Sequence, residues 1–267
     1  MGLSRCGAAG SWRGLGVAVG VALCVSVVAT AVYAVVVSRH SVNVDSAAGS
    51  VADLGPWAAG EAVALRNAEG QVAARVWPVG VVSGAHAGRF VVVAHNESES
   101  VIRLGGAVHG VDRGGRPYFV NLSGSSIAHT RIPAGERVML VIDTPPSTQT
   151  PDIGAFVITE EYRFDGTIAV EQTTLHGRAA AVSYRKQSRY TALRGRAFVG
   201  CRDERGRLVA AGQHPTPVIT SEPGQITVPL TWSPDQTADD AAEVRCVASV
   251  VEDKFKERFP LPDKAPA

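Results

Sequence analysis

The feature that most constrains this chain is the alternation of short apolar runs with turn residues that begins at Val72. Runs rich in Val, Ile, Phe and Tyr recur about every 8–12 positions, a spacing that is typical of β-sandwiches and barrels. Helical periodicity is nearly absent, although the stretch 235–244 suits a short helix. The sequence therefore predicts an all-β body built as one or two immunoglobulin-like β-sandwiches.

The predicted strands of the first domain are short and closely spaced. They cover 72–77, 89–95, 101–110, 116–121, 126–132, 136–143, 153–163, 167–174 and 178–184. Turn residues lie between them, because Gly readily adopts positive φ and Asp bonds to its own backbone. The pair Asp165-Gly166 separates two alternating runs, which predicts a β-hairpin across it.

A second, smaller β domain is expected after a basic polar segment at 183–196. It contains a strand, a turn at Asp203–Gly206, another strand, a Pro223-Gly224 turn before a further strand, and a last strand at 242–251. A similar order of strands, Asp-containing turn and Pro-containing turn occurs at 107–144. Two related sandwiches explain this internal likeness, and so do two independent uses of common β-hairpin sequences.

An apolar segment near the N-terminus predicts a membrane helix. Gly14–Val37 carries no charged residue, and as a helix it would reach roughly 36 Å, enough to cross a hydrocarbon core of about 30 Å. We expect an uncleaved signal anchor; the alternative is a signal peptide cleaved after Ala34. Arg5 and Arg13 precede the segment, so both alternatives place the body outside the cytosol.

These patterns together predict an order of domains along the chain. The expected order is a short cytosolic tail at 1–13, a transmembrane signal anchor at 14–38, a stalk at 39–71, an immunoglobulin-like sandwich at 72–185, a second β domain at 186–252 and a Pro-containing tail at 253–267. The fold class is thus all-β, with one or two immunoglobulin-like β-sandwiches following a single N-terminal transmembrane helix.

Composition and motifs indicate no catalytic, metal or cofactor site. A net charge of +1 and a charged fraction of 19% give no reason to expect nucleic acid or an acidic substrate. The histidines show no zinc-ligand spacing, and nucleophile-elbow and phosphate-loop motifs are missing. Adjacent Glu160 and Glu161 would point to opposite faces of a strand. We expect no enzyme, cofactor or small-molecule substrate; a hydrolase with a dispersed site is the remaining alternative.

Two cysteines lie within β-like runs of the distal part of the chain. Cys201 and Cys246 are compatible with one disulfide in an oxidising compartment. The alternative is a pair of buried free thiols. If the internal likeness reflects two sandwiches, the disulfide would suit a bond between the two sheets of the second one.

Two N-glycosylation sequons lie in the predicted first sandwich. They are Asn96-Glu-Ser and Asn121-Leu-Ser, the first at a predicted turn and the second at the end of a predicted strand. In a eukaryotic lumen both are candidate surface sites for a glycan. Such short motifs also arise often by chance.

The motif order of the first domain resembles the lumenal domain of the translocon-associated protein alpha subunit, over about residues 75–182. The resemblance lies in a strand ending in Asn at a turn, an aromatic strand running into a sequon, a Pro-led turn and a hairpin with Tyr. The matching positions are Asn96, the run 118–123, Pro133, Pro146, Tyr162 and Asp165-Gly166. That family carries its membrane span after this domain, whereas the apolar segment here precedes it.

The resemblance implies a non-catalytic, single-pass membrane protein that assists secretory-protein translocation. It implies a body in the endoplasmic reticulum lumen and partners among other membrane or secretory proteins. The alternative is a bacterial cell-envelope protein, anchored in the plasma membrane, with β-sandwiches facing outward to bind envelope components or partner proteins. The internal likeness and the lack of a distal span favour this alternative, while the motif order and the sequons favour the first.

Overall fold

The computed structural model describes most of the chain from Leu54 to Glu252. The described residues are 54–112, 114–122, 125, 127–128, 130–146, 151–154, 156–161, 168–186, 194–217, 219, 223–236 and 244–252. The predicted tail, signal anchor and C-terminal tail lie outside this range. Among the described residues, no helix has the length and apolar character needed to span a bilayer.

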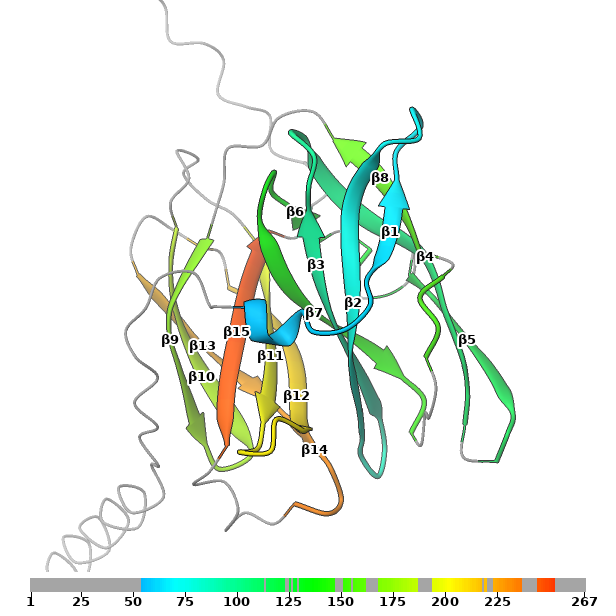
Figure 1. Cartoon of the computed structure of the whole chain (residues 1–267). Helices are drawn as coiled ribbons and strands as arrows, with labels where there is room; N and C mark the ends of the chain where they lie inside the picture. Colours follow the sequence, from blue (N-terminus) through cyan, green and yellow to red (C-terminus); the bar gives the residue numbers. More distant parts are fainter. Residues whose placement is uncertain are drawn as a thin grey trace, which may run out of the picture. The chain divides into compact units, whose positions relative to one another are not determined.

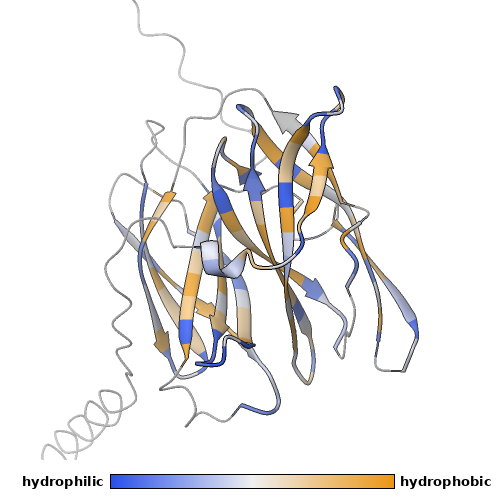
Figure 2. Cartoon of the chain, in the orientation of Figure 1, coloured by the Kyte–Doolittle hydropathy of each residue, from blue (hydrophilic) through white to orange (hydrophobic). Residues whose placement is uncertain are grey.

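β-strands dominate the described part, so the all-β prediction is confirmed (Figure 1). In chain order the strands are β1 (Val63–Arg66), β2 (Val72–Ser83), β3 (Gly88–Asn96), β4 (Val101–Val111), β5 (Pro117–Asn121), β6 (Arg131–Ile132), β7 (Arg137–Thr144), β8 (Phe156–Glu161), β9 (Ile168–His176), β10 (Ala179–Lys186), β11 (Gly195–Arg202), β12 (Leu208–Pro215), β13 (Gly224–Pro229), β14 (Thr231–Trp232) and β15 (Arg245–Glu252). Figure 2 shows hydrophobic colour mainly along the strands and hydrophilic colour mainly at the hairpin ends.

Most predicted strands lie close to observed ones, but the strand predicted at 126–132 is reduced to β6. The backbone N–H groups of Ser125, Ala128 and Thr130 each donate to the carbonyl three residues earlier. Those hydrogen bonds pair backbone groups within successive turns. The segment therefore forms turns there in place of pairing with a neighbouring strand. The short helix suggested for 235–244 falls mostly outside the described residues.

The strands form four antiparallel sheets. Their orders are β1-β2-β3-β7, then β5-β4-β6 with β8 also paired to β4, then β13-β10-β9, and β14-β12-β11-β15. The hairpin predicted across Asp165-Gly166 is wrong, because β8 pairs with β4 whereas β9 pairs with β10 in another sheet. The turn residues themselves lie outside the described part. Alternation identified both strands correctly, but it carries no information about which strand each one pairs with.

Strand pairing also crosses the domain boundary expected at residues 185–186. β10 ends at Lys186 and pairs along its length with β13 as well as with β9. Strands β9 and β10 therefore belong with β11–β15, and the chain passes from one group of sheets to the other between β8 and β9.

Two hydrophobic cores lie between the sheets. The first gathers side chains of β2, β3, β4 and β7, and the second those of β10, β11, β13 and β15. Phe198 of β11, Ala211 of β12 and Val251 of β15 belong to the first core, although their strands also border the second. The sheet β14-β12-β11-β15 thus packs against β1-β2-β3-β7 with one face and against β13-β10-β9 with the other.

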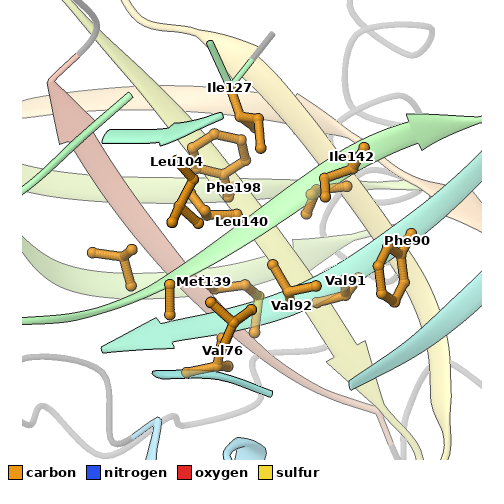
Figure 3. Close-up of a cluster of buried hydrophobic side chains, with 14 of the residues drawn as sticks. Val76, Phe90, Val91, Val92, Leu104, Ile127, Met139, Leu140, Ile142 and Phe198 are labelled. Carbon is orange, nitrogen blue, oxygen red and sulfur yellow. The ribbon is translucent and has the colours of Figure 1, made fainter. Parts of the chain in front are cut away.

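This layering explains why several strands are apolar on both faces. Residues Phe90–Ala94 of β3 and Val138–Ile142 of β7 are buried without interruption. Consecutive residues of a strand point to opposite faces, so such runs require a packed layer on each side. Figure 3 shows consecutive Met139 and Leu140 in the same cluster as Phe198 of β11.

Polar contacts accompany this apolar packing between β7 and the second group of strands. The backbone N–H of Met139 donates to Ser249 Oγ at 2.8 Å, and Gln213 Nε2 donates to Asp143 Oδ1 at 2.8 Å. An ion pair joins Arg131 Nη1 to Glu252 Oε1 at 3.2 Å. The two groups of sheets are therefore joined by specific contacts as well as by buried surface.

The chain from Leu54 onward is part of the core, which differs from the stalk expected over 39–71. Leu54, Trp57 and Leu65 are all buried. Trp57 lies in a short 3₁₀ helix, Gly55–Trp57. The guanidinium carbon of Arg202 lies 4.2 Å from the centroid of the Trp57 ring, and burial lowers the pKa of Arg202. These few apolar residues lack a periodic pattern, which is why their burial was not expected.

Three hairpins share one turn. Asn67, Asp112 and Asp203 each accept a hydrogen bond on the backbone carbonyl from a Gly three residues later. Each also accepts one on its side-chain oxygen from the backbone N–H four residues later. The glycines have φ between +73° and +80°, where a Cβ would be strained. The hairpins are β1–β2, β4–β5 and β11–β12.

The strand order repeats along the chain. β2, β3, β4, β5, β7 and β8 form sheets β2-β3-β7 and β5-β4-β8, and β9, β10, β11, β12, β13 and β15 form sheets β9-β10-β13 and β12-β11-β15. In both sets, the first, second and fifth strands share one sheet, while the third strand pairs with the fourth and sixth. We call these sets the first and second repeats. The shared order favours two related units over chance likeness of hairpins.

The close contact between the repeats predicts a sensitive position at Gly200. A Cβ there would lie 2.8 Å from Met139 Sδ and 3.0 Å from Trp57 Cζ3. We expect Gly200→Val to lower the free energy of unfolding by about 1–3 kcal/mol, because these buried groups must move. Thr227→Val, on the exposed face of β13, is the matched control, with an expected change within about 0.5 kcal/mol. Urea unfolding measures both; equal stability of Gly200→Val and the wild type would contradict this packing.

Candidate functional site

The predicted disulfide pair is brought together, though not where it was expected. The Sγ atoms of Cys201 and Cys246 lie 2.11 Å apart, which is bonding distance. The two residues face each other on β11 and β15, neighbouring strands of one sheet. The expected bond between two sheets is therefore corrected to a bond within one sheet. It fastens the last described strand to β11 beside the second core.

The side chain of Asn96 is buried and hydrogen-bonded within the protein. Its Nδ2 donates to the carbonyls of Ser100, Ile132 and Pro133 at 2.7–3.0 Å, and its Oδ1 accepts from the backbone and hydroxyl of Ser98. The residue is fully buried. Asn96 thereby ties the end of β3 to the turn before β4 and to β6, which is far away in the sequence.

This arrangement bears directly on the two predicted glycosylation sites. A glycan is attached through Nδ2, which in Asn96 is buried and already donates to three carbonyls. Glycosylation at Asn96 is therefore incompatible with this fold. Asn121 is exposed at the end of β5, as a glycan acceptor must be. Its sequon partner Ser123 lies outside the described residues.

The described residues offer no group of three His, Cys, Asp or Glu side chains that could hold a metal ion. The side chains of the adjacent Glu160 and Glu161 lie outside the description, although both residues belong to β8. The expectations of no catalytic residue and no cofactor remain predictions. The most informative surface feature is an apolar one, which strand alternation alone did not single out.

Among the described residues, two large apolar side chains are clearly exposed, and both lie on the same sheet. Phe119 of β5 is 60% exposed and Val157 of β8 is 54% exposed. Both strands pair with β4, and they lie on its opposite edges, because His109 of β4 pairs with Phe119 on one side and with Asp152, just before β8, on the other.

We call this surface the outer β4 face. It includes Arg103, Gly105, Ala107 and His109 of β4, Phe119 and Asn121 of β5, and Val157 and Thr159 of β8; Ala107 at its centre is only 6% exposed. Their neighbours in sequence point the other way, into the first core: Tyr118, Val120, Phe156 and Ile158 pack there. Alternation of side chains along each strand places these residues together on the opposite face.

Side chains of the outer β4 face contact their cross-strand neighbours. The rings of His109 and Phe119 meet edge to face, with centroids 5.1 Å apart. Val157 leans over Gly105, since a Cβ on that glycine would lie 3.4 Å from Val157 Cγ2. Tyr118 packs on the backbone of Gly110 beneath the face, within hydrogen-bonded strands. An exposed sheet face of this kind suits contact with another protein surface better than enclosure of a small ligand.

Sequence reasoning missed this face for a specific reason. In the run 117–121, Phe119 and its neighbours Tyr118 and Val120 are all apolar. The sequence therefore does not show whether Phe119 or its two neighbours face the core. The Gly105-Gly106 pair in β4 was a usable signal. Glycines in the middle of a strand often mark a close approach of neighbouring groups.

Comparisons with known proteins add no relative. No family model, no curated protein and no solved structure matches this chain.

The role of Asn96 predicts a large effect of a small substitution. Asn96→Asp replaces the buried amide donor with a carboxylate facing three carbonyls. We expect the free energy of unfolding to fall by about 3 kcal/mol or more, because a buried charge loses water without gaining a donor. Gln172→Glu, at an exposed position of β9, also changes an amide to a carboxylate and should stay within about 0.5 kcal/mol. Chemical denaturation compares them; equal effects would contradict the structural role of Asn96.

The Cys201–Cys246 bond predicts a stability difference that depends on redox state. The bond spans 45 residues, and the chain-entropy model gives about 4 kcal/mol for a loop of that length. We expect the double variant C201A/C246A to be about 2–4 kcal/mol less stable than the wild type without reductant. Dithiothreitol should remove most of the difference. A difference that persists unchanged in reductant would mean that the thiols contribute only through packing.

Proposed function

We propose that this chain is a non-catalytic, membrane-tethered interaction protein whose outer β4 face contacts another membrane or secretory protein. The segment 14–38 is its single membrane span, and the body lies outside the cytosol. In this proposal the body consists of two immunoglobulin-like sandwiches, and the first resembles the lumenal domain of the translocon-associated protein alpha subunit.

The topology supports the immunoglobulin-like assignment. In that fold strands B and E lie in one sheet and strands C and F in the other. Each repeat has its second and fifth strands in one sheet and its third and sixth in the other. The extra fourth strand, β5 or β12, pairs with the third strand, as strand C′ does in variants of the fold.

The observation that carries the interaction role is the placement of Phe119 and Val157. Single scattered apolar residues on a surface are ordinary, whereas the two exposed large apolar side chains of the described part share one sheet face. Phe119 is also an aromatic residue, the type enriched at the centres of interfaces. The Cys201–Cys246 pair supports an oxidising compartment, which is consistent with a body outside the cytosol.

The bacterial cell-envelope alternative gains from two observations. The repeated strand order supports the internal duplication that favoured this alternative. The burial of Asn96 removes one of the two sequons that had favoured a lumenal location. The lumenal and the cell-envelope proposals both place a contact surface on a membrane-tethered body. They share this site and differ in the compartment and the partner.

Photo-crosslinking tests the proposed contact. Benzoylphenylalanine replaces Phe119 in the full-length chain, expressed in its own cells, and the control position is Thr227 on the exposed face of β13. We expect a discrete protein adduct from position 119 and none from position 227, because the reactive group abstracts hydrogen only from atoms in contact. No adduct at position 119, or equal adducts at both positions, would contradict the proposal.

A further inference from the structure

The first described segment of the chain, residues 54–58, lies outside both repeats. It contains the 3₁₀ helix Gly55–Trp57, and it pairs with none of the described strands. The backbone N–H groups of Trp57 and Ala58 donate to carbonyls within the segment itself. The segment can therefore leave its place without breaking the hydrogen bonds of the described sheets. We call residues 54–58 the strap.

Trp57 of the strap lies where the two repeats meet. A Cβ atom on Gly200 would lie 2.8 Å from Met139 Sδ and 3.0 Å from Trp57 Cζ3. Gly200 belongs to β11 of the second repeat and Met139 to β7 of the first; we call this contact the junction. Trp57 is only 6% exposed. The ring therefore fills space at the junction that the glycine leaves open.

Arg202 holds the strap from the second repeat. Its guanidinium carbon lies 4.2 Å from the centroid of the Trp57 ring, which is a cation–π contact. Its Nη1 also donates to the carbonyl of Pro56 at 3.1 Å. One side chain of β11 thus contacts both the ring and the backbone of the strap. Arg202 thereby keeps Trp57 against Gly200.

Two adjacent amides of β7 report separately on the junction and on the sheet. The backbone N–H of Met139 donates to Ser249 Oγ of the second repeat at 2.8 Å. The backbone N–H of Asn96 donates to the carbonyl of Glu136, so the even-numbered residues of β7 are the ones that bond to β3. The amide of Leu140 is therefore bonded within the first repeat, whereas that of Met139 is bonded across the junction.

We propose that the strap holds the two repeats together, and that withdrawing it loosens the junction without unfolding either repeat. Without the ring, the space beside Gly200 is empty and Met139 loses a packed neighbour. The strap precedes β1 in the chain, so a pull on the N-terminal segment reaches Trp57 first. This conformational control goes beyond the proposed contact function and does not depend on what covers the outer β4 face.

Amide hydrogen exchange of the full-length chain in detergent micelles tests this proposal. Arg202→Ala removes the side chain that holds the strap. We expect exchange of the Met139 amide to become about tenfold faster, because a shielded cation–π contact and a hydrogen bond are lost. The Leu140 amide should stay within about twofold of the wild type, because the strands of the first repeat remain paired.

Arg137→Ala is the matched control. Arg137 also lies over a tryptophan, with its guanidinium carbon 5.9 Å from the centroid of the Trp77 ring, but neither residue belongs to the strap. Exchange of the Met139 and Leu140 amides should therefore stay within about twofold of the wild type.

A double variant separates the strap from ordinary packing. Trp57→Ala should accelerate the Met139 amide at least as much as Arg202→Ala, and combining the two should add nothing, because the arginine acts through the ring. Equal acceleration of the Met139 and Leu140 amides in either variant, or failure of Trp57→Ala to fold, would overturn the proposal, since withdrawal would then unfold the sheet itself. Unchanged Met139 exchange in Arg202→Ala, or additive effects in the double variant, would overturn it as well.

Discussion

The packing of β7 against β11 is the contact on which the rest of the body depends. Met139 lies over Gly200, and its backbone N–H donates to Ser249 on β15. Because this contact covers the second face of the sheet β1-β2-β3-β7, its strands can be apolar on both sides. Trp57 completes it by packing on the same glycine, which draws the N-terminal end of the described chain into the core.

The polar details serve the same arrangement. Asn96 satisfies three carbonyls at the end of β3, where the sheet gives way to turns. The Cys201–Cys246 bond joins β15 to β11, the strand that contacts both cores.

The proposed function follows from the way in which the sheets of the two repeats stack. The four sheets stack through three interfaces that bury six of their eight faces. Of the two open faces, the outer β4 face is the one that exposes large apolar side chains among the described residues, Phe119 and Val157.

Much of the fold could be predicted from the sequence because strands and tight turns are local. Alternation located strands such as β7 and β9, and the residues at Asp112 and Asp203 identified two of the three related turns. Which strands pair with each other was harder to predict. The Asp165-Gly166 pair predicted a hairpin, yet β8 joins β4 and β9 joins β10, and that choice depends on long-range burial. The continuous apolar run of β3 was the available signal for a layer on each side.

The candidate site was harder to predict than the fold. Cys201 and Cys246 could be paired by elimination, but their place within one sheet requires the register of β11 and β15. The Asn96 motif indicated a surface residue, whereas its side chain donates to the carbonyls of Ser100, Ile132 and Pro133. The contact with Ile132, 36 residues away in the chain, cannot be read from the local sequence. Exposure of Phe119 depends on which face of β5 meets the core, and the run 117–121 is apolar in both sets.

Hydroxyl-radical footprinting of the full-length chain in detergent tests the central claim most directly. The chain has only two methionines, Met1 and Met139, so oxidation of Met139 is easily resolved. The stacked arrangement predicts that Met139, which is fully buried, is protected from oxidation in the folded protein. Ready oxidation of Met139 in the folded protein would contradict the stacking of the repeats.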